Sequence, residues 1–416
     1  MSLITIASIL VTLCAVFSYI NYRFIKLPTT IGIMVIALLL STAMLLLPLL
    51  GVELLPYARD ILNHINFSET LLHGMLSFLL FAGALHINMQ DLKQQKYIVS
   101  ILAFFGTLFS TAAIGGGAYY IFQFLGLNIP FIYALLFGAL ISPTDPIAVM
   151  AILKKAGVPK SLEIKVVGES LFNDGIAVVV FIAILGIATS GETTPFHVAE
   201  LFLMEAAGGA LLGLLLGYIA YLMLKSVDNY QVEIFLTLAL VMGGYELARA
   251  LHMSGPIAMV VAGLLVGNIG RTHAMSDHTK ENLDNFWELI DEFLNAGLFL
   301  LIGFELLALS FNPSALYAGL IMIPTLLLVR YISVFLPIKI SSYIRSFSPG
   351  AINILTWGGL RGGISVALVL SLPTGEIRDI FLLITYCIVL FSILVQGLTI
   401  GRVARYYSHK TPVTPS

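Results

Sequence analysis

Among the ionisable residues inside the long apolar stretches of this chain, four need a special account, namely Asp145, Glu169, Asp174 and Arg361. An ionised side chain at the centre of a bilayer costs roughly 2.5–3.5 kcal/mol on insertion scales, and such residues usually mark ion or proton pathways. Carboxylate oxygens are hard ligands that suit small cations. If the apolar stretches cross a membrane, these residue types therefore indicate binding of a cation or a proton inside it.

The first of these stretches contains "SPTDP" at 142–146, which places Asp145 between Thr144 and Pro146. A proline inside a helix removes a backbone donor and clashes with the preceding turn, so the helix is predicted to break here. The break frees backbone carbonyls next to the carboxylate. Asp145, with the hydroxyl or carbonyl oxygen of Thr144, is therefore a candidate ligand pair for a cation, although capping of the broken helix is the simpler alternative.

The second stretch reads "VVGESLFNDGIAVVVF" at 166–181. Residues four apart share a helix face, so Ser170 and Asp174 point the same way and form a candidate cation site. Glu169 points about 100° away from them. It is the predicted structural partner of Arg361, because an unpaired buried guanidinium is very costly.

Composition requires that these stretches lie in lipid. The chain has 416 residues, of which 59% are hydrophobic and 11% charged, against roughly 25% charged in soluble domains. Runs long enough to cross about 30 Å of hydrocarbon number thirteen, at approximately 3–20, 30–50, 71–87, 97–125, 130–153, 164–190, 199–224, 231–251, 255–270, 287–310, 314–337, 349–372 and 379–400.

The basic residues predict the orientation of these spans. Sixteen of the 21 Lys and Arg residues fall in loops after odd-numbered spans or in the C-terminal tail, and basic loops stay in the cytoplasm. We therefore expect a multi-pass protein of the cell (inner) membrane, with its N-terminus outside and a short cytoplasmic tail at 401–416.

Weak internal similarity links segments that are seven spans apart. Residues 27–40 resemble 254–267, and 78–85 resemble 299–306. An odd offset makes the repeats inverted, and inverted-repeat transporters place broken helices at corresponding positions. Span 5 is interrupted at 142–146 and span 12 by "WGGLRGG" at 357–363.

The predicted fold is therefore an all-α polytopic membrane protein with two broken helices, spans 5 and 12, at corresponding positions. Its whole length forms one transporter unit, with six-helix repeats at about 3–190 and 231–400 joined by a linker span at about 199–224. Chance matching of leucine-rich segments is the alternative explanation of this internal similarity.

The chain resembles the monovalent cation:proton antiporter-1 family, the NhaP-type sodium/proton antiporters, over nearly its whole length. The resemblance rests on "SPTDPIAV" (142–149), "GESLFNDGIAVVVF" (168–181), "FWELIDEFLNAGLFLLIGFEL" (286–306) and "WGGLRGGISVALVLSLP" (357–373). It implies thirteen spans, a six-helix core domain in which the two broken helices cross, a separate dimerisation domain and a homodimer.

Carried over residue by residue, the resemblance makes Asp174 and Asp145 the ion-site carboxylates. Ser170 and the Thr144 region complete the site, and Asn173 is a helper. Glu169 and Arg361 form a stabilising pair. One position departs from the family, because Ala82 stands where relatives often carry a glutamate, which puts any role of that acid in doubt.

The expected function is exchange of one sodium or lithium ion for one proton by alternating access, with Na⁺ held by Asp145, Ser170, Asp174 and Thr144. Related antiporters with two adjacent aspartates are thought to move two protons. Neutral Asn173 at the first position therefore predicts electroneutral exchange. A potassium/proton antiporter or another monovalent cation carrier is the alternative.

An intramembrane aspartyl protease would also need two membrane aspartates. That chemistry calls for a Gly-x-Gly-Asp motif, whereas Asp174 follows "FN" and Asp145 follows "PT". We therefore expect a secondary active transporter rather than an enzyme, one that needs no cofactor, binds no nucleic acid and serves pH homeostasis.

Overall fold

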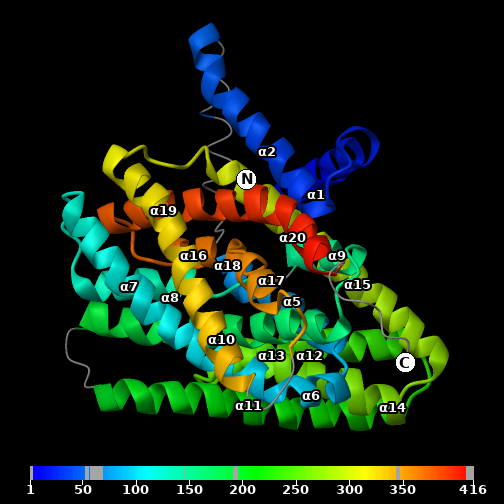
Figure 1. Cartoon of the computed structure of the whole chain (residues 1–416). Coiled ribbons are helices and arrows are strands. Elements are labelled where there is room, and N and C mark those ends of the chain that lie inside the picture. Colours follow the sequence, from blue (N-terminus) through cyan, green and yellow to red (C-terminus); the bar gives the residue numbers. More distant parts are fainter. Residues whose placement is uncertain are drawn as a thin grey trace.

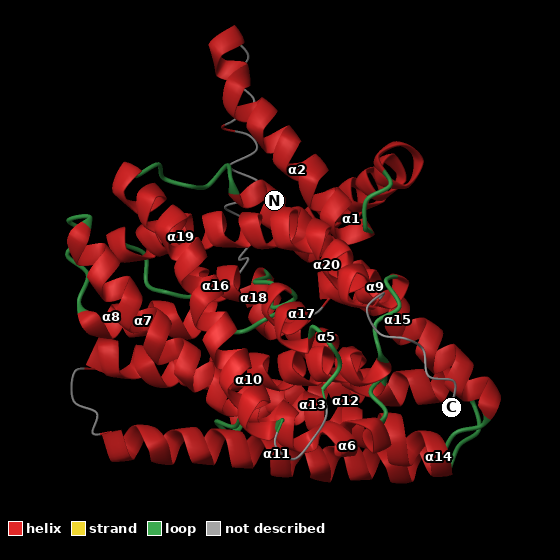
Figure 2. Ribbon diagram, viewed as in Figure 1, coloured by secondary structure: helices red, strands yellow, loops and turns green. Residues whose placement is uncertain are grey.

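Long uninterrupted apolar segments fold as helices in lipid, because a helix satisfies its backbone polar groups within the segment. The computed structural model describes residues 3–51, 56, 69–145, 147–190, 195–342 and 347–408. Within those ranges it is helical with short connections and has no strand (Figure 2).

The N-terminal half holds the helices α1 (Leu3–Ile20), α2 (Thr29–Leu46), α5 (Leu76–Leu85), α6 (Met89–Ser100), α7 (Gly106–Phe124), α8 (Phe131–Ile141), α9 (Ile147–Lys155) and α10 (Lys160–Ser190). Short 3₁₀ or π-helical turns extend some of them, namely η1 (Asn21–Ile25), η2 (Leu47–Leu50), η3 (Thr70–Met75) and η4 (Ile101–Phe105).

The C-terminal half holds α11 (Pro195–Lys225), α12 (Tyr230–Ala250), α13 (Gly255–Leu265), α14 (Arg271–His273), α15 (Asp277–Glu305), α16 (Pro313–Ser341), α17 (Ala351–Trp357), α18 (Gly363–Leu370), α19 (Glu376–Phe391) and α20 (Leu398–Ser408). Two further π-helical turns are η5 (Val266–Gly270) and η6 (Ser392–Gly397).

The all-helical, polytopic fold is confirmed. In the part of the chain that the structure describes, nine helices are long and apolar enough to cross a membrane, and Thr70–Leu85 and Phe131–Ile141 are shorter apolar helices. All thirteen predicted ranges fall largely on helix. The number of crossings, the inverted repeat and the domain boundaries remain predictions.

Two pairs of short half-helices, α8 with α9 and α17 with α18, lie on either side of the two predicted breaks. Figure 1 shows α17 and α18 near its centre together with α10, whereas α1 and α2 project from one end. Helix α8 of the first pair packs so closely against α7 that the two backbones are in contact. A Cβ atom on Gly138 would collide with the Thr111 carbonyl oxygen and with the backbone of Gly115. Glycines at such contacts let two helix axes approach closely, and this contact holds α8 in place.

Candidate functional site

The two helix breaks meet directly. Helix α8 ends at Ile141 and α9 begins at Ile147, whereas α17 ends at Trp357 and α18 begins at Gly363. The backbone N–H of Asp145 donates to the carbonyl of Leu360 at 2.8 Å and forms an isolated antiparallel bridge between the breaks. The predicted crossing of the broken helices is therefore confirmed. Pro146, the predicted breaker, lies outside the described residues.

Asp145 is packed closely against the second break. A Cβ atom on Gly362 would occupy the space of the Asp145 side chain. The glycine at this position therefore allows the carboxylate of one break to lie against the backbone of the other. Half-helix termini that face each other in this way leave backbone groups and charges pointing into one small region.

The hydroxyl and amide groups predicted to belong to the site form one buried cluster. Thr144 Oγ1 lies 2.9 Å from Ser170 Oγ and accepts a hydrogen bond from Asn173 Nδ2 at 2.8 Å. The Thr144 N–H donates to Asn173 Oδ1 at 3.4 Å. Asn173 is thus hydrogen-bonded to both the backbone and the side chain of Thr144, and these bonds connect the first break to α10.

Asp174 lies one residue further along α10 and is only 6% exposed. Within the described part of the chain its Oδ1 atom has no hydrogen-bond partner. The carboxyl of Asp145 and the guanidinium of Arg361 are both near enough to act on it electrostatically. A buried carboxylate oxygen without a donor is costly, so this atom is available to a cation or a proton.

Arg361 joins the two breaks through the carbonyls that the first break leaves unpaired. Its Nη1 donates to the carbonyl oxygens of Ser142 and Pro143, the latter at 2.7 Å. Its own backbone N–H donates to Ser392 Oγ at 2.8 Å. The guanidinium therefore satisfies backbone oxygens that lipid could not.

The predicted partner of Glu169 requires correction. The structure pairs Glu169 with Arg330 of α16 through two hydrogen bonds, of which Arg330 Nη2 to Glu169 Oε2 measures 2.9 Å. Arg330 Nη2 also donates to the Leu355 carbonyl at 3.1 Å. The physical reason is that the Arg361 guanidinium donates to the carbonyls of the first break. Arg330, in contrast, donates two hydrogen bonds to the two oxygens of the Glu169 carboxylate.

Sequence reasoning missed Arg330, although a signal was present. A guanidinium inside the apolar run 314–337 needs a buried acceptor, and Glu169 was the acidic residue predicted to play a structural role. Spacing along the chain could not choose between Arg330 and Arg361, because both are far from Glu169 in sequence.

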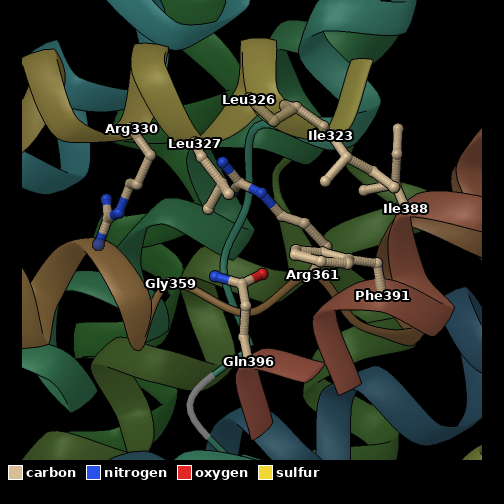
Figure 3. A pocket seen from close by; sticks show the side chains of 9 residues that line it. All are labelled: Ile323, Leu326, Leu327, Arg330, Gly359, Arg361, Ile388, Phe391 and Gln396. Carbon is tan, nitrogen blue, oxygen red and sulfur yellow. The ribbon is translucent and has the colours of Figure 1, made fainter. Parts of the chain in front are cut away.

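A small cavity separates the two arginines. It measures ≈ 20 Å³ and is lined by Arg330, Gly359, Arg361 and Gln396 together with apolar side chains of α16 and α19. In Figure 3 the two arginines enter it from different elements, α16 and the second break. The volume is that of a site for about one water molecule. None of the predicted cation ligands lines it, so it is distinct from the carboxylate cluster.

Ala82, the departure from the family pattern, is buried in α5 and brings no polar side chain to the site. Any contribution of a carboxylate at this position is therefore absent from this chain.

Comparison with known proteins agrees with the architecture. A family model described as "Sodium/hydrogen exchanger, transmembrane" matches residues 9–406. The Na⁺/H⁺ antiporter NhaP of Pseudomonas aeruginosa is 52% identical over 401 residues, which are 95% of each chain. The chain belongs to the sodium/hydrogen exchanger family. It is accordingly a multi-pass membrane transporter rather than a catalytic enzyme, and its family transports monovalent cations and protons.

A further relative and a solved structure agree with this assignment. The Na⁺/H⁺ antiporter NhaH of Halobacillus dabanensis is 38% identical over 390 residues, covering 90% of this chain and 94% of the relative. The structure of the antiporter MjNhaP1 from Methanocaldococcus jannaschii superimposes with a TM-score of 0.75 at 21% identity, covering 98% of this chain and 99% of that one. The predicted resemblance to NhaP-type antiporters is thereby confirmed.

Loss of the Glu169 carboxylate should destabilise this exchanger. We expect Glu169→Gln to lower the thermal unfolding midpoint in detergent markedly, because breaking one partner of a buried ion pair costs about 3–5 kcal/mol. Glu246→Gln is the matched control, since its pair with Arg249 is exposed and exposed pairs are worth about 0–1 kcal/mol.

A double-mutant cycle measures which arginine is the partner. The combination of Glu169→Gln with Arg330→Gln should be strongly non-additive, and more so than its combination with Arg361→Gln. Stronger coupling to Arg361 would contradict the observed pairing.

Proposed function

We propose that this protein exchanges one sodium or lithium ion for one proton across a cell membrane by secondary active, alternating-access transport. The observation that carries the proposal is the buried Asp174 carboxyl, whose Oδ1 has no hydrogen-bond donor in the described part of the chain. An ionised carboxylate in such a place needs a compensating cation or a bound proton. The names of the curated relatives, Na⁺/H⁺ antiporters, favour the same function.

The proposed cation ligands are Asp145, Ser170, Asp174 and Thr144. Asp145 and Asp174 supply charge, and Ser170 with Thr144 supplies neutral oxygens that lie side by side. Asn173 is proposed to hold Thr144 in position rather than to bind the ion, because its amide is already engaged by Thr144.

Exchange follows from competition for one site. With a cation bound, Asp174 is ionised and its charge is compensated. When the cation leaves, a proton takes its place, because a bare buried carboxylate is much less stable than a neutral one. Only the compensated states are proposed to cross the barrier between the two access states, and this restriction couples the two fluxes.

One proton per cation is the proposed stoichiometry. Asn173 carries no titratable group, so the α10 motif supplies a single proton carrier next to the break. Such a cycle moves no net charge and is insensitive to membrane potential, whereas each net charge moved would couple to about 2.3 kcal/mol per 100 mV.

The wider organisation is also part of the proposal. We propose a homodimer, as the resemblance to NhaP-type antiporters implies. We also propose an inner-membrane location with an external N-terminus and a cytoplasmic tail at 401–416, an orientation that the basic-residue bias favours. Repeats at about 3–190 and 231–400, related by inversion around the span at 199–224, are proposed because the two breaks lie in corresponding spans. No cofactor is proposed, since cation and proton gradients supply the driving force.

A potassium/proton antiporter is the second candidate. The proposed ligands are all oxygen atoms, and oxygen ligands by themselves do not decide ion size. Transport assays with Na⁺, Li⁺ and K⁺ in turn separate the two candidates.

Asp174→Asn should abolish exchange while the protein still folds. The amide keeps the shape of the carboxyl but neither carries a charge nor takes up the transported proton. The measurement is dequenching of a pH-sensitive dye in proteoliposomes after addition of Na⁺, Li⁺ or K⁺, with size-exclusion chromatography as the test of folding. Glu246→Gln, a surface change, should retain exchange, and sodium-dependent proton movement that persists in Asp174→Asn would refute the site.

Electroneutrality has its own measurement. When Na⁺ is added to proteoliposomes that contain the protein and a potential-sensitive dye, proton movement should occur with no change in membrane potential. A potential that develops with the proton flux, and that the Asp174→Asn protein does not generate, would show that more than one proton is exchanged per cation.

A further inference from the structure

Two buried polar side chains outside the proposed ion site lie against the second helix break. Ser392 and Gln396 are four residues apart in the π-helical turn η6 and are 1% and 4% exposed. Turns of this type occur frequently at functional sites. Polar groups that are buried away from water need hydrogen-bond partners, and these two side chains find theirs on the backbone of the break between α17 and α18.

The two side chains form a series of three hydrogen bonds. The backbone N–H of Arg361 donates to Ser392 Oγ at 2.8 Å, and this hydroxyl donates to Gln396 Oε1 at 2.9 Å. Gln396 Nε2 then donates to the Trp357 carbonyl at 3.0 Å. A backbone N–H only donates and a carbonyl only accepts, so both side chains are held in one orientation. We call this series the Ser392–Gln396 link, and Figure 3 shows Gln396 extending toward Arg361.

The Ser392–Gln396 link joins the two backbone groups that a continuous helix would pair directly. In an α-helix each N–H bonds to the carbonyl four residues earlier. If α17 continued without interruption, the Arg361 N–H would therefore bond to the Trp357 carbonyl. Side chains that insert between such groups interrupt a helix. The link thus replaces one helical hydrogen bond with a longer path through two side chains.

This separation fixes the segment that contacts the first break. The Leu360 carbonyl accepts from the Asp145 N–H at 2.8 Å, and the Arg361 guanidinium donates to the Pro143 carbonyl at 2.7 Å. The glycines of "WGGLRGG" lower helix stability but do not supply partners for backbone groups, and unpaired backbone groups in lipid favour helical pairing. Without the link, pairing of Trp357 with Arg361 would move Leu360 away from Asp145.

We propose that Ser392 and Gln396 are positioning residues for the cation site, which keep the second helix interrupted in the conformation that supports Asp145. They act through Leu360 rather than by contact with the ion. This inference rests on the proposed function and identifies what keeps that same site formed. If the interrupted form is the one that binds the cation, its fractional population sets the apparent affinity.

The test is sodium-dependent proton movement in proteoliposomes that contain purified protein. Ser392→Ala and Gln396→Met each remove one part of the link. We expect each to raise the apparent KM for Na⁺ about 3–10-fold, the size that corresponds to loss of roughly one net hydrogen bond. The kcat value should stay close to that of the wild type, because a saturating cation selects the interrupted form.

Two control variants separate the hydroxyl from general packing. Ser392→Thr keeps the hydroxyl and should keep a KM near the wild-type value. Ser41→Ala is the matched control, because Ser41 is also fully buried and donates to the Gly303 carbonyl at 2.9 Å, between α2 and α15. This variant loses a buried hydrogen bond of the same kind, so its thermal unfolding midpoint should fall while its KM stays unchanged.

The double variant tests whether the two side chains act as one unit. Since the link fails when either part is lost, Ser392→Ala with Gln396→Met should raise KM no further than the larger of the two single effects. Independent, multiplying effects would contradict the link.

Four other results would overturn the proposal. They are an unchanged KM in both single variants, a loss of kcat at unchanged KM, a Ser392→Thr protein as impaired as Ser392→Ala, and failure of both single variants to fold where Ser41→Ala folds. The second and fourth would assign a purely structural role to the two residues, and the third would assign the effect to packing.

The wild-type protein separates this inference from the proposed function. If wild-type proteoliposomes move no protons in response to Na⁺, Li⁺ or K⁺, the proposed function itself fails. If they do and both single variants match them in KM, the exchange function stands and only the positioning role fails.

Discussion

The structure depends on the crossing of two interrupted helices and on the need to satisfy the backbone groups that the interruptions expose. Lipid offers no hydrogen bonds, so broken helices persist only where protein groups replace water. Here the Asp145 N–H bonds to the Leu360 carbonyl, and the Arg361 guanidinium bonds to the carbonyls of Ser142 and Pro143. Each break thus donates hydrogen bonds to backbone carbonyls that the other break leaves unpaired. Without these bonds, neither break would be stable in a bilayer.

Around this crossing, most of the buried charged and polar groups have a fixed partner. Glu169 and Arg330 neutralise each other and connect α10 to α16, and Arg361 is occupied by backbone oxygens. Asn173 is occupied by Thr144. Asp174, beside them, keeps an oxygen without a donor in the described part of the chain. In the proposed exchange cycle these fixed groups give the site its shape, and Asp174 is the carboxyl whose charge state changes.

Much of this arrangement could be predicted from local sequence. Period-four spacing placed Ser170 and Asp174 on one face of a helix, and "SPTDP" placed a break at Asp145. The structure then brought Thr144, Ser170 and Asn173 within hydrogen-bonding distance. The predicted pairing of Glu169 with Arg361 was wrong. An arginine inside the membrane must have a hydrogen-bond acceptor, but the sequence does not show which acceptor it contacts.

The sequence by itself determined that the chain lies in lipid, where its helices fall and which residues carry charge into the membrane. These properties follow from composition, hydropathy and helical periodicity, which are local. Only the tertiary structure decided that the two breaks bond to each other and that Arg330 rather than Arg361 neutralises Glu169. Those outcomes depend on how distant helices pack, and hydrogen bonds and ion pairs act over a few ångströms in space whatever the separation along the chain.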